Sequence, residues 1–256
     1  MCLITFAYKT HPKFKLILAG NRDEFYARPT RKAKFWTEEG HPELLAGKDL
    51  QGGGTWLGVH KDGRWGALTN YRDFSLKKDN PPTRGELVLD YLKSSFSAPD
   101  YLESIKPKAK QYNGFNLLLG DKNGLYHFLN QEREINTVKP GIHGLSNASL
   151  DTPWKKLTLA NAELSNVISK DEFEKEELFK LLINEKKALE KDLPSTGLSQ
   201  EMEKAVSSIF IKTQDYGSRC STILLIQKDG TIDFTERRFK AGTSSMDGEQ
   251  HFQFKI

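Results

Sequence analysis

The order of strand and helix patterns along the chain constrains its fold more than any other feature of the sequence. Two hairpin patterns occur up to Asn70, helical periodicity follows, and strand patterns return twice, separated by a second group of helices. Strands and helices that occur in runs, without strict βαβ alternation, indicate an α+β fold with antiparallel sheets. We see no internal repeat and no linker, so we predict one domain over residues 1–256.

The chain begins with a predicted antiparallel hairpin. Cys2–Lys9 alternates like a strand, His11 and Pro12 mark a turn, and Lys13–Ala19 reads as the returning strand. The polar quartet Asn21–Glu24 follows this return strand directly. The hairpin therefore brings the quartet back beside the start of the chain.

Downstream of the quartet, a segment punctuated by Pro and Gly extends to Gly54 and predicts irregular structure. Thr83, with Glu86 three residues later, has the pattern of a capping box at the start of a helix. We predict further helices over Pro99–Tyr112, Thr152–Ser169, Phe173–Leu189 and Glu201–Phe210, a loop over Gly141–Leu150, and strands over Thr55–His60, Arg64–Asn70, Phe115–Leu119, Leu125–Asn130, Ile135–Val138, Cys220–Gln227, Thr231–Arg238 and His251–Ile256.

Charge and cysteine content argue against several classes of protein. The net charge is +4, but Lys and Arg are mixed with Asp and Glu, so we predict no nucleic-acid partner, while an anionic small ligand is compatible. Cys2 and Cys220 are the two cysteines, and no Cys/His cluster predicts a metal site. The apolar run Cys2–Ala7 is too short for a transmembrane segment and lacks the basic region of a signal peptide. We expect a cytoplasmic protein with free thiols, with an organellar address left open.

A cysteine at position 2 is a candidate nucleophile. Removal of Met1 would leave Cys2 with a free α-amino group, whose ordinary pKa of about 7.7–8.0 suits it to take the thiol proton at neutral pH. The thiolate is the reactive form, and this pairing resembles that of other N-terminal nucleophiles. The alternative is that Cys2 is a small apolar residue buried in a strand.

The quartet supplies charged neighbours for this cysteine. We expect Arg22 to lower the pKa of the Cys2 thiol and Asp23 to orient the new α-amino group. Glu24 would raise that pKa if it lay close, so we expect it to pair with Arg28 or Arg72. The alternative for the quartet is a polar turn with a surface Arg/Asp pair, which contributes little to stability.

Several motifs in order along the chain resemble the NRDE-domain family, the family of Transport and Golgi organisation protein 2. The resemblance runs from Cys2 to about residue 226. It rests on Met1–Leu3, Gly20–Glu24, Gly53–Trp56, Thr69–Arg72, Asn113–Leu117, Gly144–Asn147, Pro153–Lys156 and Tyr216–Arg219 followed by Ser221 and Thr222. Cys220 is a departure, because a small or hydroxyl residue is expected at that position.

This resemblance implies a four-layer αββα sandwich of two antiparallel sheets, as in N-terminal-nucleophile hydrolases, with a distant likeness to choloylglycine hydrolase and penicillin V acylase. It implies that Cys2 is the nucleophile and that the catalytic set also contains Arg22, Asp23, Asn147 and Arg219. Asn147 would donate to an oxyanion or substrate, and Arg219 would be a second cationic group. Residues expected to contact a ligand are Asn21, Glu24, Trp56, Asn70 and Arg72.

The resemblance also implies two different functions. The first is an intracellular carrier of an amphipathic anionic ligand, associated with haem mobilisation or with acyl-CoA and lipid handling. No cofactor is required, and haem would be cargo. His127 and His143 lack the context of a haem-binding motif. The second is a Cys2-dependent amidohydrolase or thioesterase, so enzymatic activity stays open. The state of Met1 separates them, because a retained Met1 leaves Cys2 without its built-in base.

Overall fold

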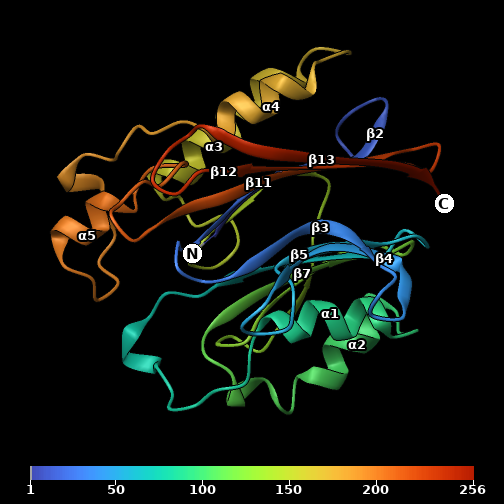
Figure 1. The fold of residues 1–256 in the computed structure, drawn as a ribbon, viewed down its shortest axis with the longest axis horizontal. Helices are drawn as coiled ribbons and strands as arrows, with labels where there is room; N and C mark the ends of the chain where they lie inside the picture. The colour runs from blue at the N-terminus through green and yellow to red at the C-terminus, as the bar shows by residue number, and fades with distance from the viewer. Residues whose placement is uncertain (1) are drawn as a thin grey trace. The chain divides into compact units, whose positions relative to one another are not determined.

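The computed structural model describes Cys2 to Ile256 and contains two compact units (Figure 1). The first unit comprises the chain up to Ala27 together with Pro140–Phe254, and the second comprises Arg28–Lys139 with Lys255–Ile256. Each unit is built on one antiparallel sheet with accompanying helices, which confirms the α+β class. Within the described chain, no helix is both long and apolar enough to cross a membrane. The single domain over residues 1–256 stays a prediction.

The first unit contains a six-stranded antiparallel sheet. Its N-terminal hairpin confirms the sequence prediction, because Cys2 lies opposite Arg22 in the pairing of the first two strands. The second strand is also paired on its other side, with the long strand that begins at Tyr216. In spatial order the strands are β10 (Gly141–Leu145), β1 (Cys2–Tyr8), β2 (Phe14–Phe25), β11 (Tyr216–Gln227), β12 (Thr231–Phe239) and β13 (Met246–Lys255).

Two segments of this sheet were not predicted as strands. The quartet Asn21–Glu24 continues β2, because β1 and β11 both pair with this part of the strand. Gly141–Leu145 lies within the predicted loop but forms β10, because it pairs with the outer side of β1. Since side chains alternate along a strand, successive residues of the quartet point to opposite faces of the sheet.

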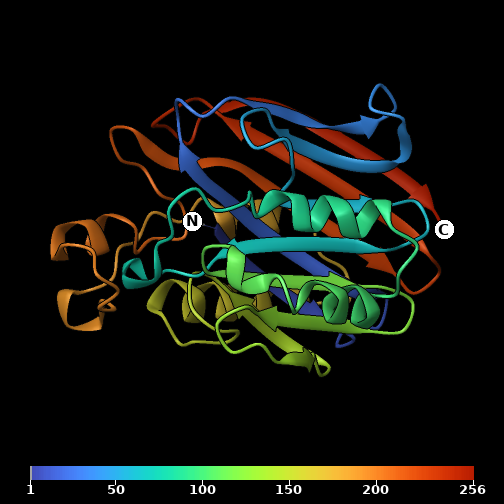
Figure 2. The same ribbon diagram turned by 90° about the horizontal axis from the view of Figure 1, so that it is seen from below.

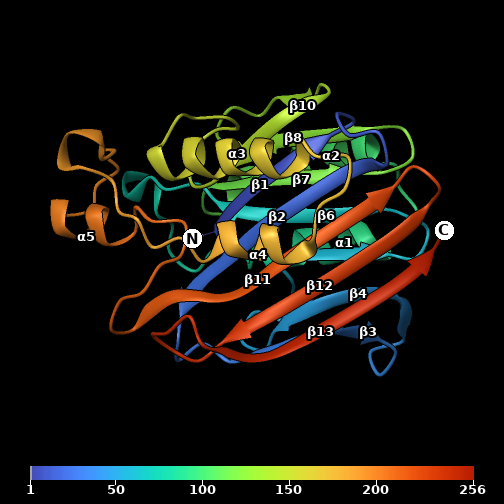
Figure 3. The same ribbon diagram turned by 90° about the horizontal axis from the view of Figure 1, so that it is seen from above.

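Helices cover one face of this sheet (Figure 3). Helix α3 (Lys155–Ile168) contacts β1 and β10, and helix α4 (Lys175–Leu182) contacts β2 and β11. A third helix, α5 (Gln200–Ala205), lies in the segment that leads back to the sheet. The core between helices and strands is apolar and includes Leu3, Ile17, Ile223, Leu157 and Leu178. Burial of one such side chain contributes about 1.5–3 kcal/mol.

The second unit contains a seven-stranded antiparallel sheet. Its order follows the chain: β3 (Thr30–Trp36), β4 (His41–Asp49), β5 (Leu57–His60), β6 (Trp65–Asn70), β7 (Phe115–Gly120), β8 (Leu125–Leu129) and β9 (Ile135–Thr137). The hairpin of β3 and β4 falls in the segment predicted to be irregular. Its pairing changes register twice, and such irregularities hide the alternation by which a strand is recognised in a sequence.

Helices α1 (Gly85–Lys93) and α2 (Ala98–Ile105) lie across one face of this second sheet (Figure 2). The predicted capping box at Thr83 is wrong, because Arg84 is the N-cap and makes no side-chain capping hydrogen bond. The Glu86 carboxylate instead accepts a short hydrogen bond from the Tyr112 hydroxyl. The described residues also form three short 3-10 helices, at Phe74–Leu76, Ala109–Gln111 and Glu190–Asp192.

Candidate functional site

Cys2 begins β1 in a buried position. It is 8% exposed, and burial is the main reason that the pKa of its thiol is raised. The nearby Asp23 carboxylate also raises this pKa, whereas the Arg22 guanidinium and a hydrogen bond from the Asp23 backbone amide lower it. The predicted influence of Arg22 therefore has the expected direction, but burial outweighs it. The predicted removal of Met1 concerns a residue outside the described part of the chain.

A polar row crosses the sheet at the level of Cys2. Cys2 lies opposite Arg22, Arg22 lies opposite Cys220, and Cys220 lies opposite Arg238. Directly opposed residues on neighbouring antiparallel strands point to the same face, so these four side chains share one face of the sheet. The next residue, Leu3, belongs to the core under α3 and α4, so the row lies on the face away from these helices.

Asp23 is buried on the helical side of the sheet. It is 2% exposed, and its Oδ1 atom accepts a hydrogen bond of 2.6 Å from the Ser218 hydroxyl. Burial raises the pKa of its carboxyl to about 6, against the opposing influence of Lys156, Ser218 and Arg22. Arg22 and Asp23 therefore lie on opposite faces of β2, and they influence Cys2 from different sides.

Asn21 lies two residues before Asp23 on β2, so its side chain points to the same, helix-covered face of the sheet. Its Nδ2 atom donates to the backbone carbonyls of Leu182 at 2.8 Å and Ile209 at 2.9 Å. Its Oδ1 atom accepts a hydrogen bond of 2.6 Å from the Ser221 hydroxyl. The side chain is fully buried and connects β2 with the end of α4 and with the segment before β11. These contacts give Asn21 a structural role in this unit.

Arginine side chains gather around the polar row. Arg219 is the extra residue of an irregularity in β11, between Ser218 and Cys220, and its Nη1 atom donates to the carbonyl of Phe25 at 2.8 Å. Burial, together with the charges of Arg22 and Arg238, lowers the pKa of the Arg219 guanidinium. The charges of Arg22 and Arg238 therefore reach Arg219, and guanidinium groups are well suited to bind an anion.

Glu24 is the carboxylate on the same face of β2 as Arg22. The two side chains approach to 3.6 Å, and the Glu24 carboxylate also accepts a hydrogen bond from the Phe25 backbone amide. Arg28, one of the partners predicted for Glu24, forms an ion pair of 2.7 Å with Asp49 in the second unit. Glu24 thus offsets part of the positive charge beside Cys2.

Asn147 follows β10 and reaches the start of β1. Leu145 lies opposite Ile4, so the two residues after it run alongside the beginning of the chain. The Ser146 hydroxyl donates to the Cys2 carbonyl at 3.1 Å and lies 3.3 Å from the Asn147 side-chain oxygen. Asn147 is 1% exposed. The structure therefore brings Asn147 together with Cys2, Arg22, Asp23 and Arg219 in the first unit.

The remaining predicted residues belong to the second unit. Trp56 directly precedes β5, Asn70 ends β6, and Arg72 follows two residues later. The Trp56 carbonyl accepts a hydrogen bond from the Leu68 amide at 2.7 Å, which fixes the start of β5 beside the end of β6. Trp56 and Arg72 are buried, at 8% and 9% exposure. These three residues form a second group at one end of β5 and β6.

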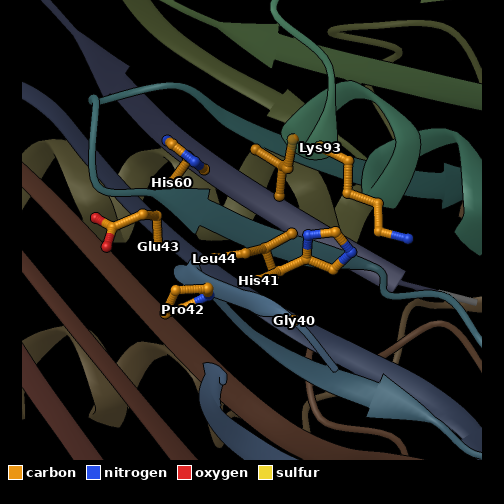
Figure 4. Close-up of a pocket in the computed structure, with 8 residues that line it drawn as sticks. Gly40, His41, Pro42, Glu43, Leu44, His60 and Lys93 are labelled. Carbon is orange, nitrogen blue, oxygen red and sulfur yellow. The ribbon is translucent and has the colours of Figure 1, made fainter. Parts of the chain in front are cut away.

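A small hollow of about 190 Å³ lies elsewhere in the second unit, beside the end of α1 (Figure 4). His41, His60, Glu43 and Lys93 contribute its polar groups, and none of them was predicted as a site residue. Burial and the nearby Lys93 charge lower the pKa of His41. Among the described residues, no three His, Cys, Asp or Glu side chains form a group that could hold a metal ion.

Sequence reasoning missed residues that support the site. The Ser218 hydroxyl donates to the Asp23 carboxylate. The Tyr216 hydroxyl donates to the Asp23 backbone carbonyl at 2.8 Å. Both lie in a motif that the sequence analysis quoted for its resemblance alone. Lys156, buried at 4% exposure, lies in another such motif. Nothing in the sequence indicated that Arg238 belongs to the site, because only the register of β12 against β11 places it opposite Cys220 in the polar row.

Comparison with known proteins shows the family to which this chain belongs. The family model described as "Transport and Golgi organisation 2" matches residues 1–241. The chain belongs to the Transport and Golgi organisation 2 family. The Transport and Golgi organization protein 2 homolog of Bos taurus is 36% identical, and the alignment covers 93% of this chain and 92% of the relative. The homolog of Homo sapiens is 34% identical over the same shares, and the Drosophila melanogaster protein is 28% identical over 92% and 91%.

A solved structure shows the fold of this family member. The Caenorhabditis elegans N-acylethanolamine-hydrolyzing acid amidase ortholog superposes with a TM-score of 0.54, covering 88% of this chain and 92% of its own. Its sequence is 10% identical, so the likeness concerns the fold alone. The chain therefore has the fold of N-terminal-nucleophile hydrolases, as the motifs predicted.

Proposed function

We propose that this Transport and Golgi organisation 2 family member is an intracellular carrier that binds an amphipathic anionic ligand beside Cys2. The observation that carries this proposal is that Arg22 and Arg238 flank Cys220 on one face of the first sheet, and that their charges also lower the pKa of Arg219, the neighbour of Cys220 in the chain. Guanidinium groups bind carboxylates and phosphates through paired hydrogen bonds. Burial strengthens such contacts, because it removes competing water.

The surroundings of these arginines motivate the ligand class that we propose. The same sheet face carries the large apolar side chains of Ile4, Phe6 and Leu18 next to the polar row. A ligand with an apolar body and an acidic end matches this combination. Haem, through its propionates, and acyl-CoA, through its phosphates, both have this character. Cargo binding requires no resident cofactor.

The proposal includes a cytoplasmic location. Cys2 and Cys220 are both free, and free thiols are typical of a reducing compartment.

Ligand titration tests the carrier proposal. Haem binding is followed by the Soret absorbance, and palmitoyl-CoA is added as a competitor. We expect Arg22→Met and Arg238→Met to weaken binding about tenfold or more, since charge-assisted hydrogen bonds contribute about 1.5–3 kcal/mol. Arg238→Met is informative if the more buried Arg22 variant folds poorly. Arg133→Met is the matched control, because Arg133 is exposed in the second unit. Failure of the unmodified protein to bind either compound contradicts the proposal.

A second candidate function rests on the immediate surroundings of Cys2. The Asp23 backbone amide hydrogen-bonds the Cys2 sulfur and Arg22 lies opposite in the sheet, and both favour the thiolate against the larger effect of burial. In this alternative the thiolate attacks an amide or thioester carbonyl, and the α-amino group carries the proton to the leaving group. Donors near Cys2, such as Asn147, would stabilise the oxyanion. The relative named as an N-acylethanolamine-hydrolyzing amidase ortholog motivates an N-acyl amide as the first substrate.

Mass spectrometry separates the two functions. An intact mass that lacks Met1, together with an acyl adduct that disappears in Cys2→Ser, supports the hydrolase. An intact mass that retains Met1, with no adduct after incubation with palmitoyl-CoA, excludes this mechanism and leaves the carrier.

A further inference from the structure

Strand β13 forms one edge of the first sheet (Figure 3). It runs from Met246 to Lys255 beside β12, and its other side has no neighbour in the sheet order. At ten residues it is longer than the usual strand of about five or six. It also lies beyond the region that the family model matches, which ends at residue 241.

The strand is held firmly on its own sheet. Glu249 pairs with Arg237 of β12, and His251 lies 2.9 Å from the Asp233 carboxylate. Edge strands present a row of backbone N–H and C=O groups on their outer side, and proteins often protect such edges with proline or with charged side chains, which repel a partner strand unless opposite charges face each other. The sequence of β13 contains no proline. Most of its residues are exposed.

The sequence of β13 is complementary to itself in one antiparallel register. If Phe252 lies opposite Phe252 of a second copy, Glu249 lies opposite Lys255 of that copy. The two-fold symmetry of such a pair repeats the contact between Lys255 and Glu249, so two pairs of opposite charge flank a central aromatic pair. Cross-strand pairs of these kinds stabilise antiparallel sheets.

We propose that this chain forms a homodimer in which β13 pairs antiparallel with β13 of a second copy, centred on Phe252. The two six-stranded sheets then continue into one another through backbone hydrogen bonds. The contact is isologous, so it closes after two copies and does not propagate into a fibre. This assembly is independent of ligand binding at Cys2.

Charge reversal tests the pairing. The mass of the protein at about 100 µM is measured by light scattering after gel filtration, and we expect a dimer. Lys255→Glu places like charges opposite each other twice, so we expect the dimer to dissociate about tenfold more readily. Glu249→Lys has the same effect. An equimolar mixture of the two variants restores opposite charges at both pairs, so we expect heterodimers. A monomeric unmodified protein, or a mixture that stays monomeric, overturns the proposal.

Cysteine cross-linking tests the register. In the proposed pairing the two Phe252 Cα atoms lie about 4.5–5.5 Å apart, within disulfide range, so Phe252→Cys should give a covalent dimer on oxidation. Gln250→Cys and His251→Cys are controls whose own copies do not face each other in this register. The native cysteines are buried, and the thermal melt of each variant confirms folding. Cross-linking that is strongest at position 251, or equal at all three, contradicts the pairing centred on Phe252.

Discussion

Replacing Asp23 with asparagine is expected to stabilise this protein at neutral pH. Asp23 is 2% exposed, and burial raises the pKa of its carboxyl from the ordinary 3.8 to about 6. The folded protein therefore holds the proton more tightly than the unfolded chain does. Above pH 6 the carboxylate is ionised in both states, and its burial then costs folding free energy.

The size of the effect follows from these two pKa values. Their difference corresponds to about 3 kcal/mol, at 1.36 kcal/mol for each tenfold change in proton affinity. Below pH 3.8 the carboxyl is protonated in both states and the cost is absent. Between pH 3.8 and 6 the folded state binds more protons, so stability falls as the pH rises. Asparagine does not ionise, and its oxygen can still accept the hydrogen bond from Ser218. We therefore expect Asp23→Asn to gain up to about 3 kcal/mol at pH 7.5, or about 6–12 °C in Tm.

Urea unfolding, followed by tryptophan fluorescence, measures this effect between pH 4 and 8. The informative quantity is the difference in unfolding free energy between Asp23→Asn and the unmodified protein, because shifts of other groups cancel in it. This difference should be small at pH 4 and grow to its full size by pH 7. Asp79→Asn, at an exposed position, is the control and should show no such trend. If Asp23→Asn is destabilising at pH 7.5, or if its effect is independent of pH, the carboxyl is not strained by burial as argued.

Three further outcomes are expected. Asn21→Ala should destabilise the protein by about 2–4 kcal/mol in urea unfolding, because it leaves two buried carbonyls and a hydroxyl without their partner; a loss below 1 kcal/mol would argue against the structural role. Gly54→Ala should lower the Tm strongly, because its Cβ would lie 2.2 Å from the Gly85 carbonyl carbon, and an unchanged melt would contradict this packing. The thiols of Cys2 and Cys220 should react with Ellman's reagent at pH 7 at least about a hundredfold more slowly in the folded protein than in urea, because burial raises both pKa values; equal rates would refute their burial.

Local sequence patterns predicted the hairpins well, because both strands and their turn lie close together in the chain. The pairing of Cys2 with Arg22 follows from one short turn, and β5 with β6 and β11 with β12 are of the same kind. The quartet Asn21–Glu24 was harder, because polar residues in sequence suggest a turn. Its strand conformation depends on β11, which is nearly two hundred residues away. A strand that receives its partner from so far along the chain leaves no local signal.

Helix boundaries show the same limit at closer range. Thr83 and Glu86 have the right residue types and spacing for a capping box, yet the Glu86 carboxylate binds Tyr112 instead. The start of α1 also packs against the backbone near Gly54, where the Thr55 amide donates to the Gly85 carbonyl at 3.1 Å. A tertiary contact that satisfies the same group more favourably overrides the local motif. The sequence shows the capping-box pattern of Thr83 and Glu86, but it does not show that the Tyr112 hydroxyl will bind the Glu86 carboxylate.

Three ionisable groups with shifted pKa values lie together in the first sheet. Burial opposes the charged form of Cys2, Asp23 and Arg219, which lie on adjoining strands at the same level of the sheet. Ionisable groups so placed reduce stability, and the apolar core beneath α3 and α4 offsets that loss. A sheet selected only for stability would carry apolar residues at these positions. Closer to their connecting turn, β1 and β2 do carry buried apolar residues such as Phe6 and Leu18. Groups that weaken the fold while gathering at one place indicate selection for binding or chemistry. The strained carboxyl of Asp23 and the arginines across the sheet from it therefore fit the site beside Cys2 that we propose.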